Sequence, residues 1–311
     1  MRDGMPIAQI GSGKRRSPTQ GNVHSATRSA VRLASIGASA SSGLPASAKA
    51  SVFKALVHRW ASNHGALSRS VGRAAERYLR HFNNVNYDSE TNGEYWLMRR
   101  NIDAAVIFDV GANKGDWSLT CASICRHATI HAFEISPQTF ERLRARTVDN
   151  VRIIANPFGL SDTDGESAIN VHPNNSCLTS LIAGVDQIHH CSFAIEKARV
   201  AIGDEYCSAR AIEHIDLLKI DTEGAEHLVL GGFRRMLSEG RIKMIQFEYG
   251  MANLFSKFIL HDFYLLLEPY GFAIGKLFPN RIDFRPWRPE DEDFRGPNFV
   301  AAAAGHRLLN S

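Results

Sequence analysis

Short apolar runs alternate with amphipathic segments along residues 104–303 of this 311-residue chain. The apolar runs, which predict buried strands, lie at 104–108, 129–133, 151–155, 215–220, 243–247 and 298–303. The segments with a helical spacing of apolar residues lie at 117–124, 138–148, 228–237 and 263–267. Strands that alternate with helices predict an α/β domain.

A glycine turn joins the first predicted strand to its helix. Gly111 and Gly115 can adopt positive φ and have no Cβ, so a ligand can lie against the backbone at the helix N-terminus. The spacing Gly-x-x-x-Gly differs from the Gly-x-Gly-x-x-Gly fingerprint for pyrophosphate, and the preceding Asp109 would repel a diphosphate. Asp109 would instead attract an ammonium group, while the backbone N–H groups would meet a carboxylate. S-Adenosylmethionine carries both groups; a plain tight turn in another α/β domain is the alternative.

Glu134 stands at the end of the second predicted strand, roughly 20 positions after the glycine turn. A carboxylate at this place is suited to accept hydrogen bonds from both hydroxyls of an adenosine ribose. The alternative is a solvated carboxylate near the first turn of a helix, where the helix dipole favours negative charge.

Asp221, Glu223 and Glu226 follow the predicted strand at 215–220. Carboxylates this close repel one another, so a cation, a hydroxyl or Lys219 is expected to offset the cost. In open α/β sheets ligands bind at the carboxyl ends of the strands. We therefore expect this acidic group to face a ligand.

Five segments carry a resemblance to a known family: DVGANKGDWS at 109–118, HAFEIS at 131–136, GLSDTDG at 159–165, LLKIDTEGAEHLVLGG at 217–232 and MIQFEYG at 244–250. In this order they resemble the FkbM family of S-adenosylmethionine-dependent methyltransferases over about residues 90–305. The resemblance implies a class I methyltransferase fold, Rossmann-like, with a seven-stranded, mostly parallel sheet and helices on both faces. It also implies methyl transfer to a hydroxyl of a sugar, a glycolipid or polysaccharide precursor, or a natural product.

The resemblance also implies the residues that hold the cofactor. They are Asp109, Gly111, Asn113, Gly115, Glu134, Ser161 and Asp162. Asp162 would lie against the adenine amino group, although Asp and Ser beside Gly165 also suit any tight loop.

A hydroxyl acceptor must lose its proton during methyl transfer, and Asp221 is the first choice for the base. Glu223 and Glu248 would bind sugar hydroxyls or, with Glu226, share a divalent cation such as Mg²⁺, because hard cations prefer oxygen ligands. No dedicated metal site is predicted. Lys219, inside a strand, is expected to neutralise Asp221 or Glu248 structurally.

Three further segments differ in how much the sequence says about them. Residues 91–94, Thr-Asn-Gly-Glu, have the spacing of a capping box and predict the start of a helix. Residues 174–180 resemble the polar loop that the family places over its active site. Residues 185–214 show no clear periodicity, and the adjacent His189, His190 and Cys191 do not predict a metal site because neighbouring side chains diverge.

Charge separates the N-terminal part of the chain from the rest. Residues 1–80 hold 13 Lys and Arg against two acidic residues, while the remainder holds 23 against 30. Residues 1–50 are rich in Ser, Ala, Gly and Arg and are predicted to be disordered. Residues 51–90 are predicted to be a helical extension that caps the domain or lies on an anionic membrane surface, and residues 91–305 the methyltransferase domain.

Composition bears on compartment and on competing functions. Five cysteines without paired Cys-x-x-Cys spacing indicate neither a disulfide framework nor a zinc site, which favours a cytoplasmic protein; an N-terminal targeting segment is the alternative. A nicotinamide-dependent oxidoreductase lacks its glycine fingerprint here. A nucleic-acid-binding or RNA-modifying protein would use the basic N-terminus, but no such module follows, so no nucleic-acid partner is expected. The expected partner is a small-molecule or glycan hydroxyl acceptor.

Overall fold

The computed structural model describes residues 46–310 of the chain, which divides into two compact units, residues 1–79 and 80–311. The predicted disorder of residues 1–50 lies almost wholly outside the described residues. No described helix combines the length and the apolar character that crossing a bilayer requires.

Two helices form the described part of the N-terminal region: α2 (Ala46–Ser62) and α3 (Ala66–Phe82). The sequence predicts helix over residues 51–90; α2 begins five residues earlier, and the two helices are separated near His64, which adopts a positive φ of 47°. No side chain of α3 is buried. The prediction that these helices cap the methyltransferase domain stays a prediction.

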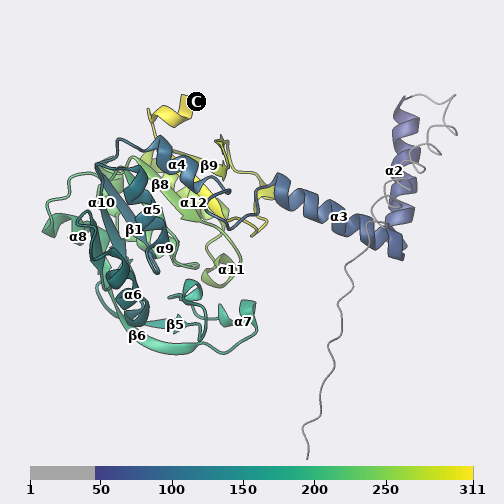
Figure 1. Ribbon diagram of the computed structural model, residues 1–311. Coiled ribbons are helices and arrows are strands. Elements are labelled where there is room, and N and C mark those ends of the chain that lie inside the picture. Colours follow the sequence, from purple (N-terminus) through teal and green to yellow (C-terminus); the bar gives the residue numbers. More distant parts are fainter. Residues whose placement is uncertain (1–45, 311) are drawn as a thin grey trace, which may run out of the picture. The chain divides into compact units, whose positions relative to one another are not determined.

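The second unit contains one large sheet and the helices that flank it (Figure 1). Its strands are β1 (Val106–Val110), β2 (Thr129–Phe133), β3 (Ile153–Asn156), β7 (Leu217–Ile220), β8 (Met244–Glu248), β9 (Phe272–Phe278), β10 (Arg281–Phe284) and β11 (Asn298–Ala303). Its helices are α4 (Glu94–Arg100), α5 (Asp116–Ile124), α6 (Pro137–Thr147), α7 (Asp186–His189), α8 (Gly203–Ala209), α9 (Glu226–Gly231), α10 (Arg234–Ser238), α11 (Asn253–Ser256) and α12 (Leu260–Leu267).

The sheet order is β10-β9-β11-β8-β7-β1-β2-β3. The five strands from β8 to β3 are parallel, whereas β11, β9 and β10 pair antiparallel at one edge. The predicted α/β class with a mostly parallel sheet is confirmed, but the sheet has eight strands rather than seven. The additional strand, β10, forms a hairpin with β9 in a segment whose proline and charge content predicts a loop.

Each central strand packs on both faces because successive side chains point to opposite sides. Phe108 and Leu218 join a core with α8, α9, α10 and α12, whereas the neighbouring Ile107 and Leu217 join a core with α4, α5 and α6. The chain order reverses between β1 and β7, with β2 and β3 on one side and β8 on the other. Such a switch point leaves a crevice at the carboxyl ends of the strands, where ligands bind in this class of sheet.

The structure differs from the sequence prediction in one helix and adds a second, smaller sheet. The helix expected at 228–237 breaks into α9 and α10 at Gly232, where an added Cβ would lie 2.2 Å from the carbonyl oxygen of Ser161. The segment 159–202 forms a second sheet from β4 (Gly159–Ser161), β5 (Gly165–Val171) and β6 (Ala194–Ile202), in the order β4-β6-β5. Local periodicity did not reveal this sheet because its pairing joins residues far apart in the sequence.

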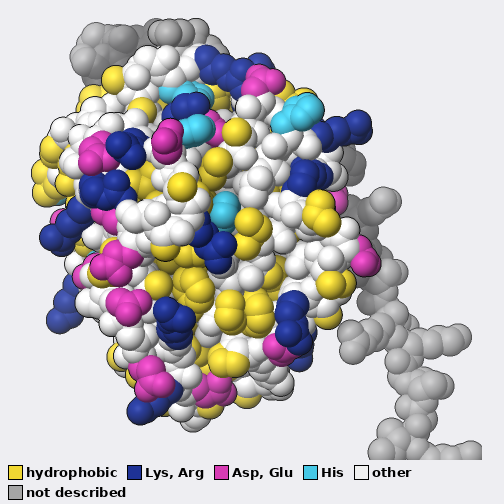
Figure 2. All heavy atoms as spheres, turned by 90° about the vertical axis from the view of Figure 1, so that its left-hand side faces the viewer, with side chains coloured by type: hydrophobic (Ala, Val, Ile, Leu, Met, Phe, Trp, Pro, Cys, Tyr) yellow, Lys and Arg dark blue, Asp and Glu magenta, His cyan; other side chains and the backbone are white. Residues whose placement is uncertain are grey.

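Basic and acidic side chains are interspersed on the face of the molecule shown in Figure 2, around a hydrophobic area at its centre. This is the side that lies to the left in Figure 1. The mixed signs contrast with the basic helices α2 and α3.

Candidate active site

A cavity of about 620 Å³ opens at the carboxyl ends of β1, β2, β7 and β8. Strand ends, the turn before α5 and the loop at 176–181 line it together. Its polar lining includes Glu94, Asn113, Lys114, Glu134, Ser176, Thr179, Lys219, Asp221, Glu223, Glu226, Glu248 and Asn298. Its apolar lining includes Trp117, Phe133, Ile135, Leu160 and Leu178. A cavity of this size accommodates a nucleoside cofactor together with part of a second substrate.

The buried Lys219 of β7 links this strand to the neighbouring strand β1 at the cavity. Lys219 Nζ lies 3.2 Å from Asp109 Oδ1 and 3.2 Å from Asp221 Oδ2, and only 5% of its side chain is exposed. Ser118 donates a hydrogen bond of 2.6 Å to the other oxygen of Asp109. Burial disfavours the charged lysine, but the two carboxylates outweigh it and raise the pKa of Lys219. Lys219 therefore stays a cation at neutral pH.

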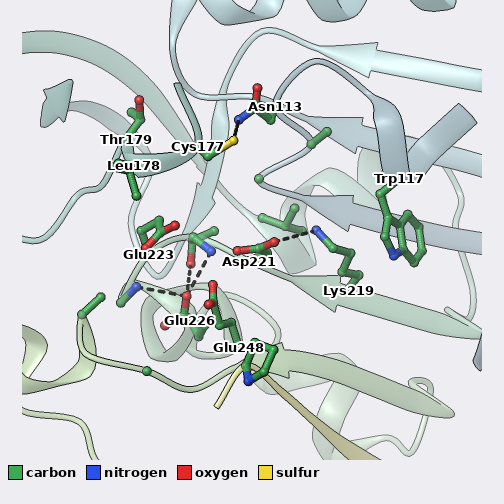
Figure 3. Close-up of a pocket in the computed structure, with 18 of the residues that line it drawn as sticks. Asn113, Trp117, Cys177, Leu178, Thr179, Lys219, Asp221, Glu223, Glu226 and Glu248 are labelled. Carbon is green, nitrogen blue, oxygen red and sulfur yellow. Dashed lines mark hydrogen bonds and ion pairs between the residues drawn. The ribbon is translucent and has the colours of Figure 1, made fainter. Parts of the chain in front are cut away.

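The ionised form of Asp221 is favoured in the cavity. Burial raises its pKa, but attraction to Lys219 and hydrogen bonds from Glu248 and Lys219 outweigh this, so its pKa is below the usual range. Its side chain is 43% exposed, and Figure 3 shows it between Lys219 and the glutamates. An ionised oxygen open to the cavity is able to accept a proton from a ligand.

The neighbouring glutamates behave differently. Burial, and then the charges of Asp221 and Glu226, raise the pKa of Glu223 to about 8. Burial and the charges of Asp221 and Glu223 raise the pKa of Glu248 well above its usual range, and its carboxyl shares a hydrogen bond with Asp221. Glu223 is therefore largely protonated at pH 7, and the raised pKa of Glu248 favours its protonated form, so both are able to donate hydrogen bonds to Asp221 or to a ligand. One oxygen of each of these three carboxyl groups lies within 4.8 Å of the others.

Glu226 shapes the loop that presents Asp221. Its Oε1 accepts hydrogen bonds from the backbone N–H of Thr222 at 3.0 Å and of Gly224 at 3.1 Å, and from the Thr222 hydroxyl (Figure 3). In this turn, Glu223 has a positive φ of 53° and Gly224 a positive φ of 99°. The carboxylate thus compensates a strained turn, which is a structural task.

Glu134 is fixed at the end of β2. Its two oxygens accept hydrogen bonds of 2.8 Å from the backbone N–H groups of Asn113 and Ser136. Burial, partly offset by these hydrogen bonds, raises the pKa of Glu134 to about 7. The carboxylate lines the cavity beside the apolar side chains of Phe133, Ile135 and Leu160.

Asn113 connects the glycine turn to the loop that borders the cavity. Its side chain accepts a hydrogen bond of 3.0 Å from Ser176 and donates one of 3.2 Å to Cys177 Sγ. From the same loop, Ser180 donates a hydrogen bond of 2.7 Å to the carbonyl oxygen of Glu223. The loop at 176–181 is therefore held at one end by Asn113 of the glycine turn and at the other by the backbone of Glu223.

The model of the Methyltransferase FkbM domain matches residues 109–274, more than half of the chain. The chain belongs to the FkbM methyltransferase family. Membership implies S-adenosylmethionine as the methyl donor in general terms, and a nicotinamide-dependent oxidoreductase or a nucleic-acid-binding protein is not favoured.

Two curated relatives are about a quarter identical to this FkbM methyltransferase over the aligned residues. 2-O-methyltransferase NoeI of Sinorhizobium fredii is 27% identical over 195 residues, which are 57% of this chain and 76% of that protein. Hexuronic acid methyltransferase AglP of Haloferax volcanii is 24% identical over 168 residues, 52% of this chain and 65% of that protein. The match therefore spans slightly less than two thirds of AglP. A solved Methyltransferase FkbM from Methylobacillus flagellatus superposes with a TM-score of 0.39 at 17% identity, over 64% of this chain and 44% of that one.

Most of the predicted site residues of the FkbM methyltransferase converge on the cavity. These are Gly111, Asn113, Glu134, Asp221, Glu223 and Glu248. Gly115, Asp109, Ser161 and Asp162 do not line it. The Asp109 side chain has no exposed surface and is occupied by Lys219 and Ser118, so its charge is balanced inside the protein. The expected ammonium contact is therefore not available to it in this arrangement.

The adenine end of the prediction also differs. Ser161 is buried and donates a hydrogen bond to Asp162, and neither residue lines the cavity, whereas Leu160 of the same strand does. Successive side chains of a strand point to opposite faces, so at the cavity the apolar Leu160 takes the place that the sequence assigned to the polar Ser161. At the glycine turn, the backbone N–H groups of Gly111 and Ala112 already donate to the carbonyl oxygen of Phe133.

Glu94 is a site residue that the sequence did not reveal. It is 6% exposed, lines the cavity and accepts hydrogen bonds from Asn92, Gln246 and Asn298. Sequence spacing suggested a capping box at 91–94, but α4 is capped by Gly93 without a side-chain hydrogen bond. The sequence did not reveal its position in the site because two of its partners, Gln246 and Asn298, come from the distant strands β8 and β11.

Replacement of Lys219 by Met is expected to lower the free energy of unfolding by about 3–5 kcal/mol, because Asp109 would be left as an uncompensated buried charge. Chemical denaturation measures the loss. The double variant Lys219→Met/Asp109→Asn removes that charge and should recover part of the stability. Equal instability of the single and double variants would instead assign the loss to packing of the lysine stem.

Proposed function

We propose that this FkbM methyltransferase transfers the methyl group of S-adenosylmethionine to a hydroxyl oxygen of a sugar, free or within a glycan, a lipid-linked precursor or a natural product. The observation that carries the proposal is geometric: Asp221, Glu223 and Glu248 bring carboxyl oxygens within 4.8 Å of one another, Lys219 lies 3.2 Å from Asp221, and Glu134 lines the same cavity. Two relatives, the 2-O-methyltransferase NoeI and the hexuronic acid methyltransferase AglP, support a sugar hydroxyl as the acceptor.

The cavity residues fit S-adenosylmethionine. Glu134, fixed by two backbone donors, retains lone pairs that accept hydrogen bonds from ribose hydroxyls. Phe133, Ile135 and Leu160 offer an apolar surface for the adenine. The ionised forms of Asp221 and Glu134 attract the positively charged sulfonium and ammonium groups. When bound, this cofactor supplies a methyl group that is already electrophilic, so positioning of the acceptor provides much of the rate increase.

Asp221 is proposed to accept the proton of the acceptor hydroxyl. Lys219 keeps this carboxylate ionised and restricts its rotation through the contact of 3.2 Å. Glu223 and Glu248, whose raised pKa values favour the protonated form, would donate hydrogen bonds to other oxygens of the sugar. The three groups thereby combine one base with two donors, which suits a polyhydroxyl ligand.

A divalent cation offers a second way to lower the pKa of the hydroxyl, because Asp221, Glu223 and Glu248 bring oxygens within 4.8 Å of one another. Treatment with EDTA distinguishes catalysis by a bound cation from catalysis by Asp221 as the base alone. If Asp221 acts as the base alone, activity is expected to survive chelation within about twofold. Loss of activity that Mg²⁺ restores would establish the cation instead.

The proposed function is tested by incubating the full chain with methyl-labelled S-adenosylmethionine and a panel of neutral sugars, uronic acids and their glycosides. Label in an alkali-stable methyl ether, located by mass spectrometry, is the expected result. Label in an alkali-labile ester would show transfer to a carboxylate and contradict an O-methyl ether product. Cofactor binding without transfer to any sugar would contradict the acceptor class.

The affinity for S-adenosylmethionine is expected to fall below pH 7. Protonation of Glu134, whose pKa is about 7, removes an acceptor for the ribose hydroxyls. If only the ionised form binds, Kd rises by up to about tenfold per pH unit below the pKa. Titration calorimetry between acidic and alkaline pH measures this slope. Glu134→Gln is the control: its Kd should be weaker at alkaline pH and nearly independent of pH, and an unchanged slope would rule out Glu134 as its source.

A further inference from the structure

Glu94 is a buried carboxylate at the wall of the cavity, and every donor that it contacts is neutral. Its Oε1 accepts hydrogen bonds of 2.8 Å from Asn92 and 3.2 Å from Asn298, and a third of 3.1 Å from Ser89. Its Oε2 accepts one hydrogen bond of 3.2 Å, from Gln246. Both oxygens accept, as those of an ionised carboxylate do. A buried carboxylate is costly unless a cation pairs with it, so this position favours a positively charged ligand.

Lys219 does not serve as the counter-ion of Glu94. Asp109, Lys219 and Gln246 are register partners on adjacent strands, so their side chains share one face of the sheet. Lys219 contacts Asp109 and Asp221 at 3.2 Å each, whereas its attraction to Glu94 acts beyond the distance of an ion pair. In the part of the chain that the structure describes, three carboxylates therefore share this lysine, and negative charge is in excess.

Hydrogen-bond acceptors are also in excess beside Glu94. Its Oε2 accepts a single hydrogen bond and keeps a free lone pair. The carbonyl oxygen of Gln246 is buried and has no partner among the described residues, while the nitrogen of the same amide donates to Glu94 and Asn298. A ligand group that is cationic and carries several N–H donors would meet both needs. An ammonium group has these properties, whereas a sulfonium has no N–H.

The order of side chains along the cavity matches the order of groups along the cofactor. Glu134 at the end of β2 is the expected partner of the ribose, and Asp221 after β7 is the proposed base, next to the transferred methyl. Glu94 bonds to residues of β8 and β11, which lie on the other side of β7 from β2. In S-adenosylmethionine the sulfur lies between the ribose and the amino-acid group. A cofactor that meets Glu134 and then Asp221 would extend its amino-acid group toward Glu94.

We propose that Glu94 binds the ammonium group of the methionine part of S-adenosylmethionine. The sequence assigns this contact to Asp109, which is enclosed with Lys219 and Ser118. The inference rests on the proposed use of this cofactor, but not on the identity of the acceptor or on Asp221 as the base. An amino-sugar acceptor also carries an ammonium group, so the experiment separates the two sources.

The test is titration calorimetry at alkaline pH without an acceptor, with two ligands that differ in one group. S-Adenosylhomocysteine carries the ammonium group, whereas its deaminated analogue keeps the adenosine, the thioether and the carboxylate. Glu94→Gln is expected to raise the Kd for S-adenosylhomocysteine at least about tenfold, and that for the analogue less than about twofold, because only the first ligand loses a charged hydrogen bond. Binding of the analogue also shows that the variant is folded. Glu94→Asp, which keeps the charge, should recover part of the affinity for S-adenosylhomocysteine.

Two control variants complete the comparison. Glu134→Gln should weaken both ligands equally, since both contain the ribose. Glu166→Gln removes an exposed carboxylate that does not line the cavity, and should leave both Kd values unchanged.

The proposal would be overturned if Glu94→Gln weakened both ligands equally or neither of them. Glucosamine binding that depends on Glu94, with unchanged binding of S-adenosylhomocysteine, would also overturn it and assign the carboxylate to an amino-sugar acceptor. Wild-type protein that binds neither nucleoside ligand would contradict the proposed cofactor itself, and with it this inference.

Discussion

Replacement of Asp221 by Asn is expected to lower kcat by a factor of about 10²–10⁴ while leaving the Kd for S-adenosylmethionine nearly unchanged. The amide has the shape of the carboxylate and still accepts a hydrogen bond from Lys219, but it does not take up the proton of the acceptor. Steady-state kinetics with a sugar acceptor and titration calorimetry with the cofactor separate the two effects.

The matched variant for this experiment is Glu223→Gln. Because the pKa of Glu223 is about 8, its carboxyl already carries a proton at pH 7, and the amide replaces a neutral group with a neutral group. Its kcat at pH 7 should fall by less than about tenfold. Equal losses in the Asp221 and Glu223 variants would contradict a single base and favour a cation shared by both carboxylates.

Replacement of Gly111 by Ala is expected to lower the free energy of unfolding by about 4 kcal/mol or more, which for many domains prevents folding. Gly111 has a φ of +84°, and an added Cβ would lie 1.9 Å from the carbonyl oxygen of Asp221. This oxygen belongs to backbone that other hydrogen bonds fix, since the N–H of Asp221 donates to Val110 at 3.0 Å. The sequence suggests that Gly111 is needed for a ligand; the structure adds that it is needed for the β1 and β7 loops to approach.

A variant at Gly305 separates the strain of a positive φ from the collision of the added Cβ with Asp221. It has a φ of +82°, nearly that of Gly111, but an added Cβ would meet no atom within 4 Å. Gly305→Ala should therefore cost only the strain of the left-handed conformation, about 1–2 kcal/mol. Urea denaturation of both variants gives the comparison. Similar losses at the two glycines would show that backbone strain, not the collision with Asp221, dominates.

The sequence by itself determined the order of the central strands and helices and the place of the site. β2 and β11 begin and end where the apolar runs do, because buried parallel strands and their immediate neighbours are continuous hydrophobic segments. Gly111, Glu134 and Asp221 each follow a strand, and parallel strands bring their carboxyl ends to one edge of the sheet. The motifs therefore predicted a common cavity without any knowledge of distances.

Only the tertiary structure decided the charge state of the carboxylates and the break in the helix at Gly232. The sequence predicts that Asp109 contacts the ammonium group of the cofactor and that Asp221 is the base, but Lys219 reaches both, with Asp109 enclosed and Asp221 open to the cavity. Glu94 and the additional strands depend in the same way on partners that are distant along the chain. A local pattern records which side chains a segment carries, whereas burial, pairing and hence pKa depend on which other segments fold against it.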